Sequence, residues 1–181
     1  MFRAVLRTQW RWTRTALLAG AVAGFAIPIL SVRHAGEAGL DAMGARHLIA
    51  SVERWSVAYP LLAAALAVAA ALGTWGADHR GRHVYALSLP ISRWRFAALR
   101  LTAGATLLLL PVAAVWIGAE AAALTAHVPA GLETYPAALA LRFALALLVA
   151  YTMMFAIAAG TARSGGLVLA ALALLLVGQV M

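Results

Sequence analysis

Residues 101–119 read LTAGATLLLLPVAAVWIGA, a run without a single charged side chain. A helix needs about 20 mostly apolar residues to cross a hydrocarbon core of about 30 Å. Further uncharged runs of similar length cover residues 15–32, 56–77, 143–162 and 164–181. Backbone inside a membrane must satisfy its own hydrogen bonds, and no run alternates like a barrel strand. We therefore predict an all-α fold, a polytopic membrane helical bundle of five transmembrane helices in one domain, residues 1–181.

The composition excludes several classes of protein. Hydrophobic residues make up 65% of the 181 residues and charged residues 11%, whereas a soluble domain has about 45–50% apolar and about 25% charged residues. A soluble enzyme is thus nearly excluded. All 14 basic residues are arginine, so the chain lacks the lysine of a nucleotide phosphate-binding loop or of a Schiff-base enzyme. It also lacks cysteine, which excludes disulfides and thiolate-held metals or clusters. We expect no cofactor.

The distribution of arginine predicts the orientation. The flanks of the apolar runs hold the positive charge, a pattern typical of a membrane protein rather than of a nucleic-acid-binding protein. The side opposite the arginine-rich one holds Arg33, Arg46 and Arg54, with Arg142 as a further candidate. Arginine-rich segments stay cytoplasmic, so we predict a multi-pass protein of the inner (cytoplasmic) membrane with its N-terminus inside and its C-terminus outside. The cytoplasmic residues are Arg3, Arg7, Arg11, Arg14, Arg80, Arg82, Arg93, Arg95, Arg100 and Arg163.

Residues 1–14 have a pattern of their own. Arginines recur there at helical spacing beside an apolar stripe of Phe2, Leu6 and Trp10. This pattern is typical of a helix lying in the membrane interface against anionic lipid, and a simple positive orientation signal is the alternative. The first 30 residues also resemble a signal peptide, but the apolar stretch is long for a signal and no convincing small-x-small cleavage site follows it before Arg33.

Two features inside the predicted spans bear on packing and charge. Gly20 and Gly24 form a small-x3-small pair, which lets another helix approach closely, and Pro111 permits a kink in the third span. Glu120 ends the third span on the outer side and Arg142 begins the fourth. Because the connection between them is short, we predict a possible external ion pair, which either has a structural role or lines an exit path.

We predict neither a metal site nor a catalytic residue. His79 and His83 are four residues apart beside Asp78, but no further ligand is evident and arginines surround them, so a solvated basic loop is favoured over a metal site. An intramembrane enzyme needs polar groups that converge at mid-depth, and the spans offer few. Glu120 and His127 would be the residues to test for such an activity.

The connection between the second and third spans is the most informative segment. Residues 78–100 read DHRGRHVYALSLPISRWRFAALR, with apolar residues too frequent for a solvated loop and a run too short to cross a membrane. Pro90 disfavours helix at Leu89, and Ser92 is suited to cap the next helix. We predict a short helix from Arg82 that lies crosswise beneath the bilayer. Its apolar residues need a surface to cover, and they are Val84, Leu87, Leu89 and Ile91.

This segment resembles the first cytoplasmic loop of the type-2 ATP-binding-cassette (ABC-2 type) transporter permeases. Members carry an acidic residue, a glycine a few positions on, a Leu-x-x-x-Pro-hydrophobic-Ser-Arg motif and a basic residue that opens the third span. The corresponding residues here are Asp78, Gly81, the segment 89–93 (Leu-Pro-Ile-Ser-Arg), which matches the Pro-hydrophobic-Ser-Arg part of the motif, and Arg100. The resemblance extends loosely over the whole chain, and its specific part lies within residues 78–93.

The resemblance implies the membrane subunit of an ATP-driven exporter. Such a subunit pairs with a second permease copy or paralogue, and two cytosolic ABC ATPase subunits dock beneath the dimer. The loop is the coupling element that contacts the ATPase, and the implied contact residues are Asp78, Gly81, Tyr85, Leu87, Leu89, Pro90, Ile91 and Arg93.

This sequence departs from the family pattern in three respects. Members usually have six spans, so a five-span chain would be a shortened member or a fragment. Asp78 stands where glutamate is usual, and Arg100 stands where lysine is common, two side chains that differ in hydrogen-bonding geometry. The alternative function is a non-transporting membrane anchor or assembly protein that recruits a cytosolic partner through the same loop.

Overall fold

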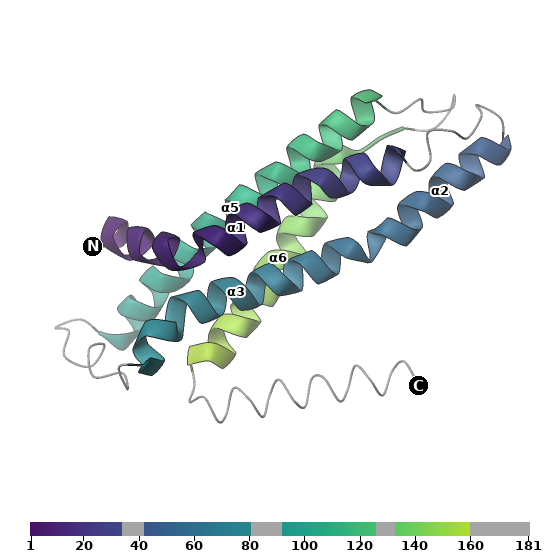
Figure 1. Cartoon of the computed structure of the whole chain (residues 1–181). Helices are drawn as coiled ribbons and strands as arrows, with labels where there is room; N and C mark the ends of the chain where they lie inside the picture. Colours follow the sequence, from purple (N-terminus) through teal and green to yellow (C-terminus); the bar gives the residue numbers. More distant parts are fainter. Residues whose placement is uncertain (34–41, 81–91, 126–132, 160–181) are drawn as a thin grey trace, which may run out of the picture.

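A computed structural model describes residues 1–33, 42–80, 92–125 and 133–159 of the chain. These ranges contain helices and no strand (Figure 1). The described part of the chain is thus all-helical, which confirms that part of the prediction. The helices are α1 (Phe2–Arg33), α2 (Ala42–Ser56), α3 (Ala58–Arg80), α5 (Arg93–Thr125) and α6 (Pro136–Ala159).

Four helical segments are long and apolar enough to cross a membrane, namely Phe2–Arg33, Ile49–Gly76, Trp94–Thr125 and Pro136–Ala159. Each overlaps one of the first four predicted spans, and the fifth, residues 164–181, lies outside the described residues. The four helices are consistent with a multi-pass membrane protein. The fifth span and the cytoplasmic N-terminus stay predictions.

The first predicted span and the predicted interfacial segment belong to one continuous helix. α1 runs from Phe2 to Arg33. It therefore contains the whole predicted span 15–32 and all of the predicted interfacial segment 1–14 except Met1. Its ribbon changes direction near the N-terminal end (Figure 1). The buried Thr13 hydroxyl donates to the Gln9 carbonyl at 2.9 Å, and such a bond to the carbonyl four residues earlier bends helices. The bend separates the arginine-rich first turns from the apolar remainder.

The fourth helix begins earlier than the uncharged run predicts. α6 starts at Pro136, so Arg142 lies well inside it rather than at its beginning. The uncharged run that predicts this span begins only after Arg142, although the preceding residues 137–141 are all alanine or leucine. Proline suits the first turn of a helix because its missing N–H has no partner there in any case. A single arginine is tolerated in such a helix because its long side chain reaches toward water.

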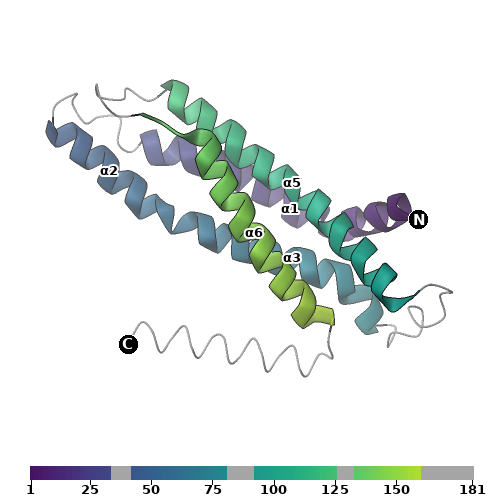
Figure 2. The ribbon, with the colours of Figure 1, turned by 180° about the vertical axis from the view of Figure 1, so that it is seen from behind.

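The second predicted span is interrupted near its start. α2 ends at Ser56, and α3 begins at Ala58. Pro60 cannot donate a hydrogen bond to the Ser56 carbonyl, and its ring crowds that carbonyl, so the helical ladder breaks there. The Ser56 hydroxyl donates instead to the Glu53 carbonyl at 2.6 Å. The two helices still follow each other along nearly one line (Figures 1 and 2).

α1 and α5 run in one direction along the bundle, and α2, α3 and α6 run in the other (Figures 1 and 2). α1 packs most extensively along α5, and α6 packs across α3 and α5. One face of α6 forms much of the core, and its buried residues recur every three or four positions: Ala140, Phe143, Leu147, Tyr151 and Phe155. Alanines on the facing side of α3 allow this close approach; the buried ones are Ala63, Ala67, Ala70 and Ala71.

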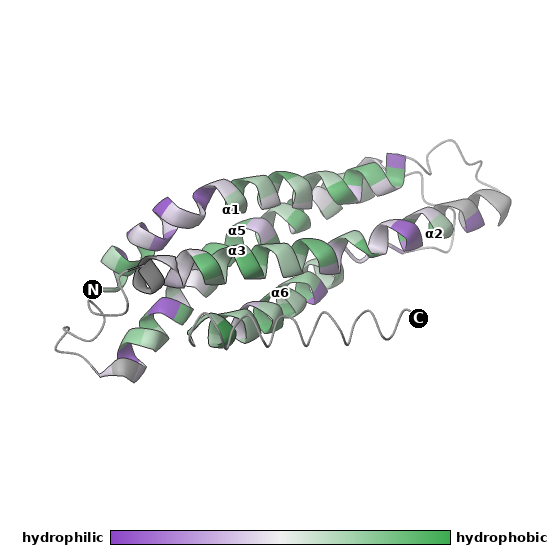
Figure 3. Ribbon diagram, turned by 60° about the horizontal axis from the view of Figure 1, so that its bottom comes forward, coloured by the Kyte–Doolittle hydropathy of each residue, from purple (hydrophilic) through white to green (hydrophobic). Residues whose placement is uncertain are grey.

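Many large apolar side chains are exposed on the outside of the bundle, and hydrophobic residues predominate along the middle of its ribbons (Figure 3). Val22 is 71% exposed in the middle of α1, and Leu61 is 66% exposed near the start of α3. Other examples on the remaining helices are Leu109, Leu141 and Val149. Water would make such a surface unfavourable, whereas lipid chains are as apolar as leucine. The outer face therefore fits a hydrocarbon environment.

Glycines bring α1 close to its neighbours. A Cβ atom at Gly20 would lie 2.4 Å from Cδ2 of Leu66 on α3, and one at Gly24 would lie 2.8 Å from Cγ2 of Val115 on α5. Gly118 on α5 makes the closest backbone approach, because a Cβ there would lie 2.4 Å from the Phe25 carbonyl oxygen. The structure thus places Gly20 and Gly24 at helix contacts and adds Gly118, which the sequence analysis did not single out.

Candidate functional site

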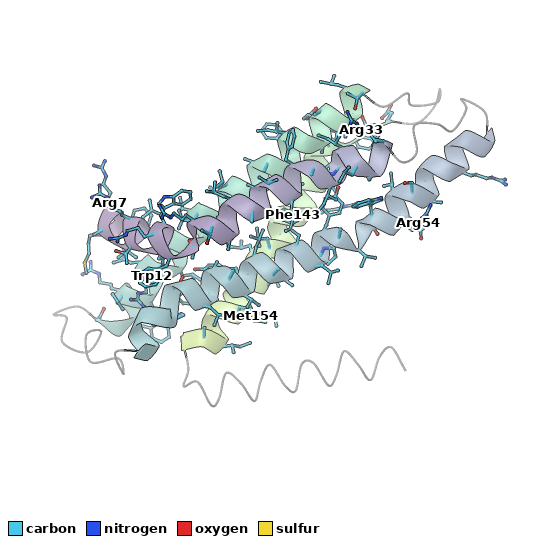
Figure 4. All side chains as sticks on the ribbon, viewed as in Figure 1. Arg7, Trp12, Arg33, Arg54, Phe143 and Met154 are labelled. Carbon is cyan, nitrogen blue, oxygen red and sulfur yellow. The ribbon has the colours of Figure 1, made fainter. Side chains whose placement is uncertain are left out.

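The end of the bundle nearest the loop 81–91 is rich in arginine. The start of α1, the end of α3 and the start of α5 meet there (Figures 1 and 3). Figure 4 shows Arg7 at this end, Arg33 and Arg54 at the opposite end, and Phe143 between the two ends. The loop end and the opposite end hold the two candidate sites described below.

At the loop end, Arg100 joins three helices. Its Nη1 donates to the Thr74 carbonyl of α3 at 3.2 Å, and its own carbonyl accepts a hydrogen bond from Nε2 of Gln9 on α1 at 3.1 Å. The Arg100 guanidinium also lies 4.9 Å from the ring centre of Trp75 and 4.4 Å from that of Phe96. A cation over aromatic rings is a favourable contact of about 0.5–1 kcal/mol at exposed sites and about 2 kcal/mol when fully removed from water, and Arg100 is half-buried. We call these five residues the Arg100 cluster.

Aromatic contacts connect the Arg100 cluster to α6. The Trp75 ring packs on Phe155 at 5.2 Å between ring centres, and Tyr151 packs on Phe155 at 5.8 Å. Three buried polar atoms here have no hydrogen-bond partner among the described residues, namely Oε1 of Gln9, Nε1 of Trp75 and the Tyr151 hydroxyl. A polar layer therefore interrupts the apolar bundle near the loop end, where α1, α3, α5 and α6 all meet.

Most of the predicted coupling residues lie outside the described part of the chain. These are Gly81, Tyr85, Leu87, Leu89, Pro90 and Ile91. Asp78 lies in the last turn of α3 and Arg93 is the first residue of α5, but only their backbone positions are described. Among the residues that the structure describes, no group of histidine, aspartate and glutamate with the spacing of a metal site is found.

The opposite end contains a cavity of about 800 Å³. All five described helices contribute to its wall, together with residues 133–135, which precede α6. Most of the wall is apolar, and it includes Pro28, Val32, Ile49, Val52, Ala119, Ala122, Leu139 and Phe143. The Ser51 hydroxyl, which donates to the Ser31 carbonyl at 3.1 Å, ties α2 to α1 beside it. Pro28 is buried within α1 beside the cavity.

Charged groups of both signs line this cavity. They are Arg142 of α6, Glu53 of α2 and Glu133, which precedes α6. The Tyr135 hydroxyl donates to the Glu133 carboxylate. This hydrogen bond, followed by a smaller contribution from loss of water, raises the pKa of Tyr135 above its ordinary value of 10. Glu133 therefore already has a donor, whereas Arg142 and Glu53 have no ionic partner among the described residues.

The predicted ion pair between Glu120 and Arg142 is not seen within the described residues. The Glu120 carboxylate accepts a hydrogen bond from Nε1 of Trp116, one turn earlier on α5, at 3.1 Å. Arg142 lines the cavity instead, and Glu120 is not among the residues of the cavity wall. Because α6 begins at Pro136, Arg142 lies further from the α5 end than a helix that starts at Arg142 would place it.

Sequence reasoning missed several residues of both sites. Arg100 was noted only as one of the arginines of the cytoplasmic side and through the resemblance, and Gln9, Thr74 and Glu53 were not noted at all. Gln9 and Thr13 lie four residues apart on α1, a polar pair that indicates an inward-facing stripe. No comparable signal marks Glu53, because charged residues near helix ends are common.

Comparison with protein-family models, with curated proteins and with solved structures finds no match for this chain. The class of this protein is therefore argued from its own sequence and structure. It is all-helical in its described part, and its four long apolar helices are consistent with a multi-pass membrane protein.

Proposed function

We propose that this chain is the membrane-spanning permease subunit of an ATP-driven ABC exporter, in which the loop 78–100 couples a separate cytosolic ATPase to substrate translocation. The resemblance of residues 78–93 to the coupling loop of ABC-2 type permeases is the basis of the proposal. In the proposed assembly a second permease copy or paralogue completes a dimer, and the chain itself carries no ATPase activity. The absence of lysine fits this division, since the nucleotide site then lies on the partner.

The Arg100 cluster is the observation that supports this function best. Arg100 lies two turns after the start of α5, and it connects that helix to α3 by a hydrogen bond of 3.2 Å and to α1 by one of 3.1 Å. A displacement of the loop therefore moves three helices together rather than bending one. A passive linker between two spans needs no such connection. The bond from the Arg100 guanidinium is charge-assisted, and such hydrogen bonds are stronger than neutral ones.

The cavity at the opposite end supports a transport function in a second way. It is about 800 Å³ in volume, and the helices that form its wall include α1, α3 and α5, which meet in the Arg100 cluster. Movement that begins at the loop end thus reaches the helices around the cavity. This arrangement provides a physical route for coupling between a motor on one side and a binding site on the other.

The partner is tested by purification. We would express the full chain with an affinity tag in its native host, extract it in a mild maltoside detergent, and identify the co-purifying proteins by mass spectrometry. The proposal requires an ATPase that carries a nucleotide phosphate-binding loop, in near-stoichiometric amount. If the chain purifies without any ATPase, the permease function is refuted and a membrane anchor or assembly protein becomes the better account.

The coupling loop is tested by a charge placed on its apolar side. Leu89→Asp should leave membrane insertion unchanged but uncouple ATP hydrolysis from transport, because a buried carboxylate without a partner is costly in an apolar contact. Ser88→Asp is the matched control, since it adds the same charge at the neighbouring polar residue. Equal coupling in both variants, measured as ATPase activity and transport in proteoliposomes, would remove the loop from the mechanism.

The predicted orientation is tested by labelling single cysteines. The chain contains no cysteine, so Thr8→Cys at the loop end and Thr134→Cys at the opposite end are unique targets for a membrane-impermeant maleimide. Both residues are exposed. In intact cells stripped of their outer envelope, Thr134→Cys should react and Thr8→Cys should react only after the membrane is opened. The reverse pattern would place the loop outside, where no cytosolic ATPase reaches it.

A further inference from the structure

The cavity opposite the loop combines an apolar wall with opposite charges. Its apolar surface comes from every described helix, and its volume of about 800 Å³ lies within the range of about 300–1,000 Å³ that small-molecule sites occupy. Phe143 and Tyr59 provide aromatic surface toward the interior of the bundle. A ligand that fills such a space needs an apolar body, because water gains little from contact with this wall.

The charges on the wall define the polar part of the ligand. Arg142 lies within α6, a helix apolar enough to cross a membrane, where an unpaired charge costs at least about 2.5–3.5 kcal/mol near the centre and less toward the ends. Glu53 faces the same cavity from α2. Neither has an ionic partner among the described residues. Glu133 also keeps its negative charge, but its carboxylate already accepts a hydrogen bond from Tyr135. Arg142 and Glu53 are therefore the positive and the negative group on the wall that have no polar side-chain partner within the described part of the chain.

We infer that this cavity binds a zwitterionic phospholipid-like amphiphile, with its phosphate at Arg142 and its ammonium group at Glu53. Arginine forms paired hydrogen bonds with phosphate oxygens, and an ammonium group neutralises the carboxylate. A purely anionic amphiphile leaves Glu53 without a partner, and a purely cationic one leaves Arg142 without a partner. The apolar wall accepts the alkyl chain near the head.

This inference rests on the proposed function and names the substrate class of the permease. It is independent of the ATPase in its test, because binding is measured on the purified chain alone. Failure of binding with a co-purifying ATPase would refute only the substrate class. Binding without any ATPase would refute only the permease function.

Binding is measured on the full chain in a neutral maltoside detergent. Radiolabelled lysophosphatidylethanolamine is the probe, and unlabelled competitors separate the contributions of head and chain. Dodecyl phosphate and dodecylammonium each carry one of the two charges, and phosphoethanolamine carries both without a chain. We expect the zwitterionic amphiphile to compete at least about 10-fold better than any of the three, as loss of one charged hydrogen bond predicts. Equal competition by all three would overturn the inference.

Charge variants assign the two groups. Arg142→Gln should weaken probe binding about 10-fold or more and remove competition by dodecyl phosphate, while Glu53→Gln should do the same for dodecylammonium. Arg54→Gln, next to Glu53 but not on the cavity wall, is the control and should bind as wild type. Unchanged probe binding in both cavity variants would overturn the assignment.

A volume variant tests the location without changing charge. Ala146 lines the cavity, and Ala156 lies on the same helix away from it and is equally exposed to the outside. Ala146→Trp should abolish probe binding and Ala156→Trp should not. Normal binding by Ala146→Trp would place the amphiphile elsewhere. Competitor selectivity of the wild-type chain needs no variant, so the test stands even if one substitution prevents folding.

Discussion

The contact between Gly118 and α1 allows a prediction of stability from measured distances. A Cβ at Gly118 would lie 2.4 Å from the Phe25 carbonyl oxygen and 2.9 Å from the Phe25 Cα. Ordinary van der Waals contact begins at 3.4 Å, so Gly118→Ala forces α1 and α5 apart by about 1 Å. The obstructing atoms are backbone, and no side chain can rotate to relieve the clash.

The cost follows from how steeply packing energy falls with distance. A gap of about 0.5–1 Å forfeits a quarter to a half of each contact's dispersion energy, and α1–α5 is the most extensive helix contact of the bundle. We expect Gly118→Ala to destabilise the protein by about 1–3 kcal/mol, as overpacking in a tight core does. For a chain of this size that corresponds to a fall in Tm of about 2–12 °C.

The assay is thermal unfolding of the detergent-solubilised protein, followed by intrinsic tryptophan fluorescence. Gly76→Ala is the matched control, because a Cβ at Gly76 meets nothing within 4 Å. Alanine is the better helix former, so Gly76→Ala should leave Tm unchanged or raise it slightly. Gly20→Ala should fall between the two, since the obstructing atom there is the end of the Leu66 side chain. A Gly118→Ala protein that melts like the Gly76→Ala protein would refute the close approach of α1 and α5.

Two further predictions concern the ends of the bundle. Arg100→Gln removes the hydrogen bond to Thr74 and the contact with Trp75, and it should lower stability by about 2–4 kcal/mol in the same thermal assay. Arg100→Lys should recover only part of the lost stability. Equal Tm values for the two variants would contradict the role of the guanidinium plane. The hydrogen bond to Glu133 raises the pKa of Tyr135 above 10, so the stabilising contact is fully present below about pH 10 and is lost as pH rises through the raised pKa. The tyrosinate absorbance of Tyr135, identified as the part that Tyr135→Phe removes, should therefore appear at lower pH in Glu133→Gln than in the wild type. An unshifted titration would exclude the contact.

The membrane-long helices were predictable because their physical cause is local. Twenty consecutive apolar residues have no favourable place in water, whatever their neighbours in the fold, so the run 101–119 alone predicts a helix inside α5. The helix ends were less predictable. The uncharged run of the fourth span begins after Arg142, but in the structure the helix already begins at Pro136 and includes the six residues before Arg142. One arginine does not outweigh the apolar residues around it.

The sequence by itself determined the class of fold and the presence of a loop whose composition requires a surface to cover. Only the tertiary structure decided which residues meet across the bundle. Arg100 and Gln9 are 91 residues apart, and their hydrogen bond depends on how α1 lies against α5. Likewise, the cavity charges Arg142 and Glu53 come from α6 and α2. Hydrophobic burial has no direction, so it fixes which segments enter the membrane, whereas short-range packing and hydrogen bonding fix how they are arranged.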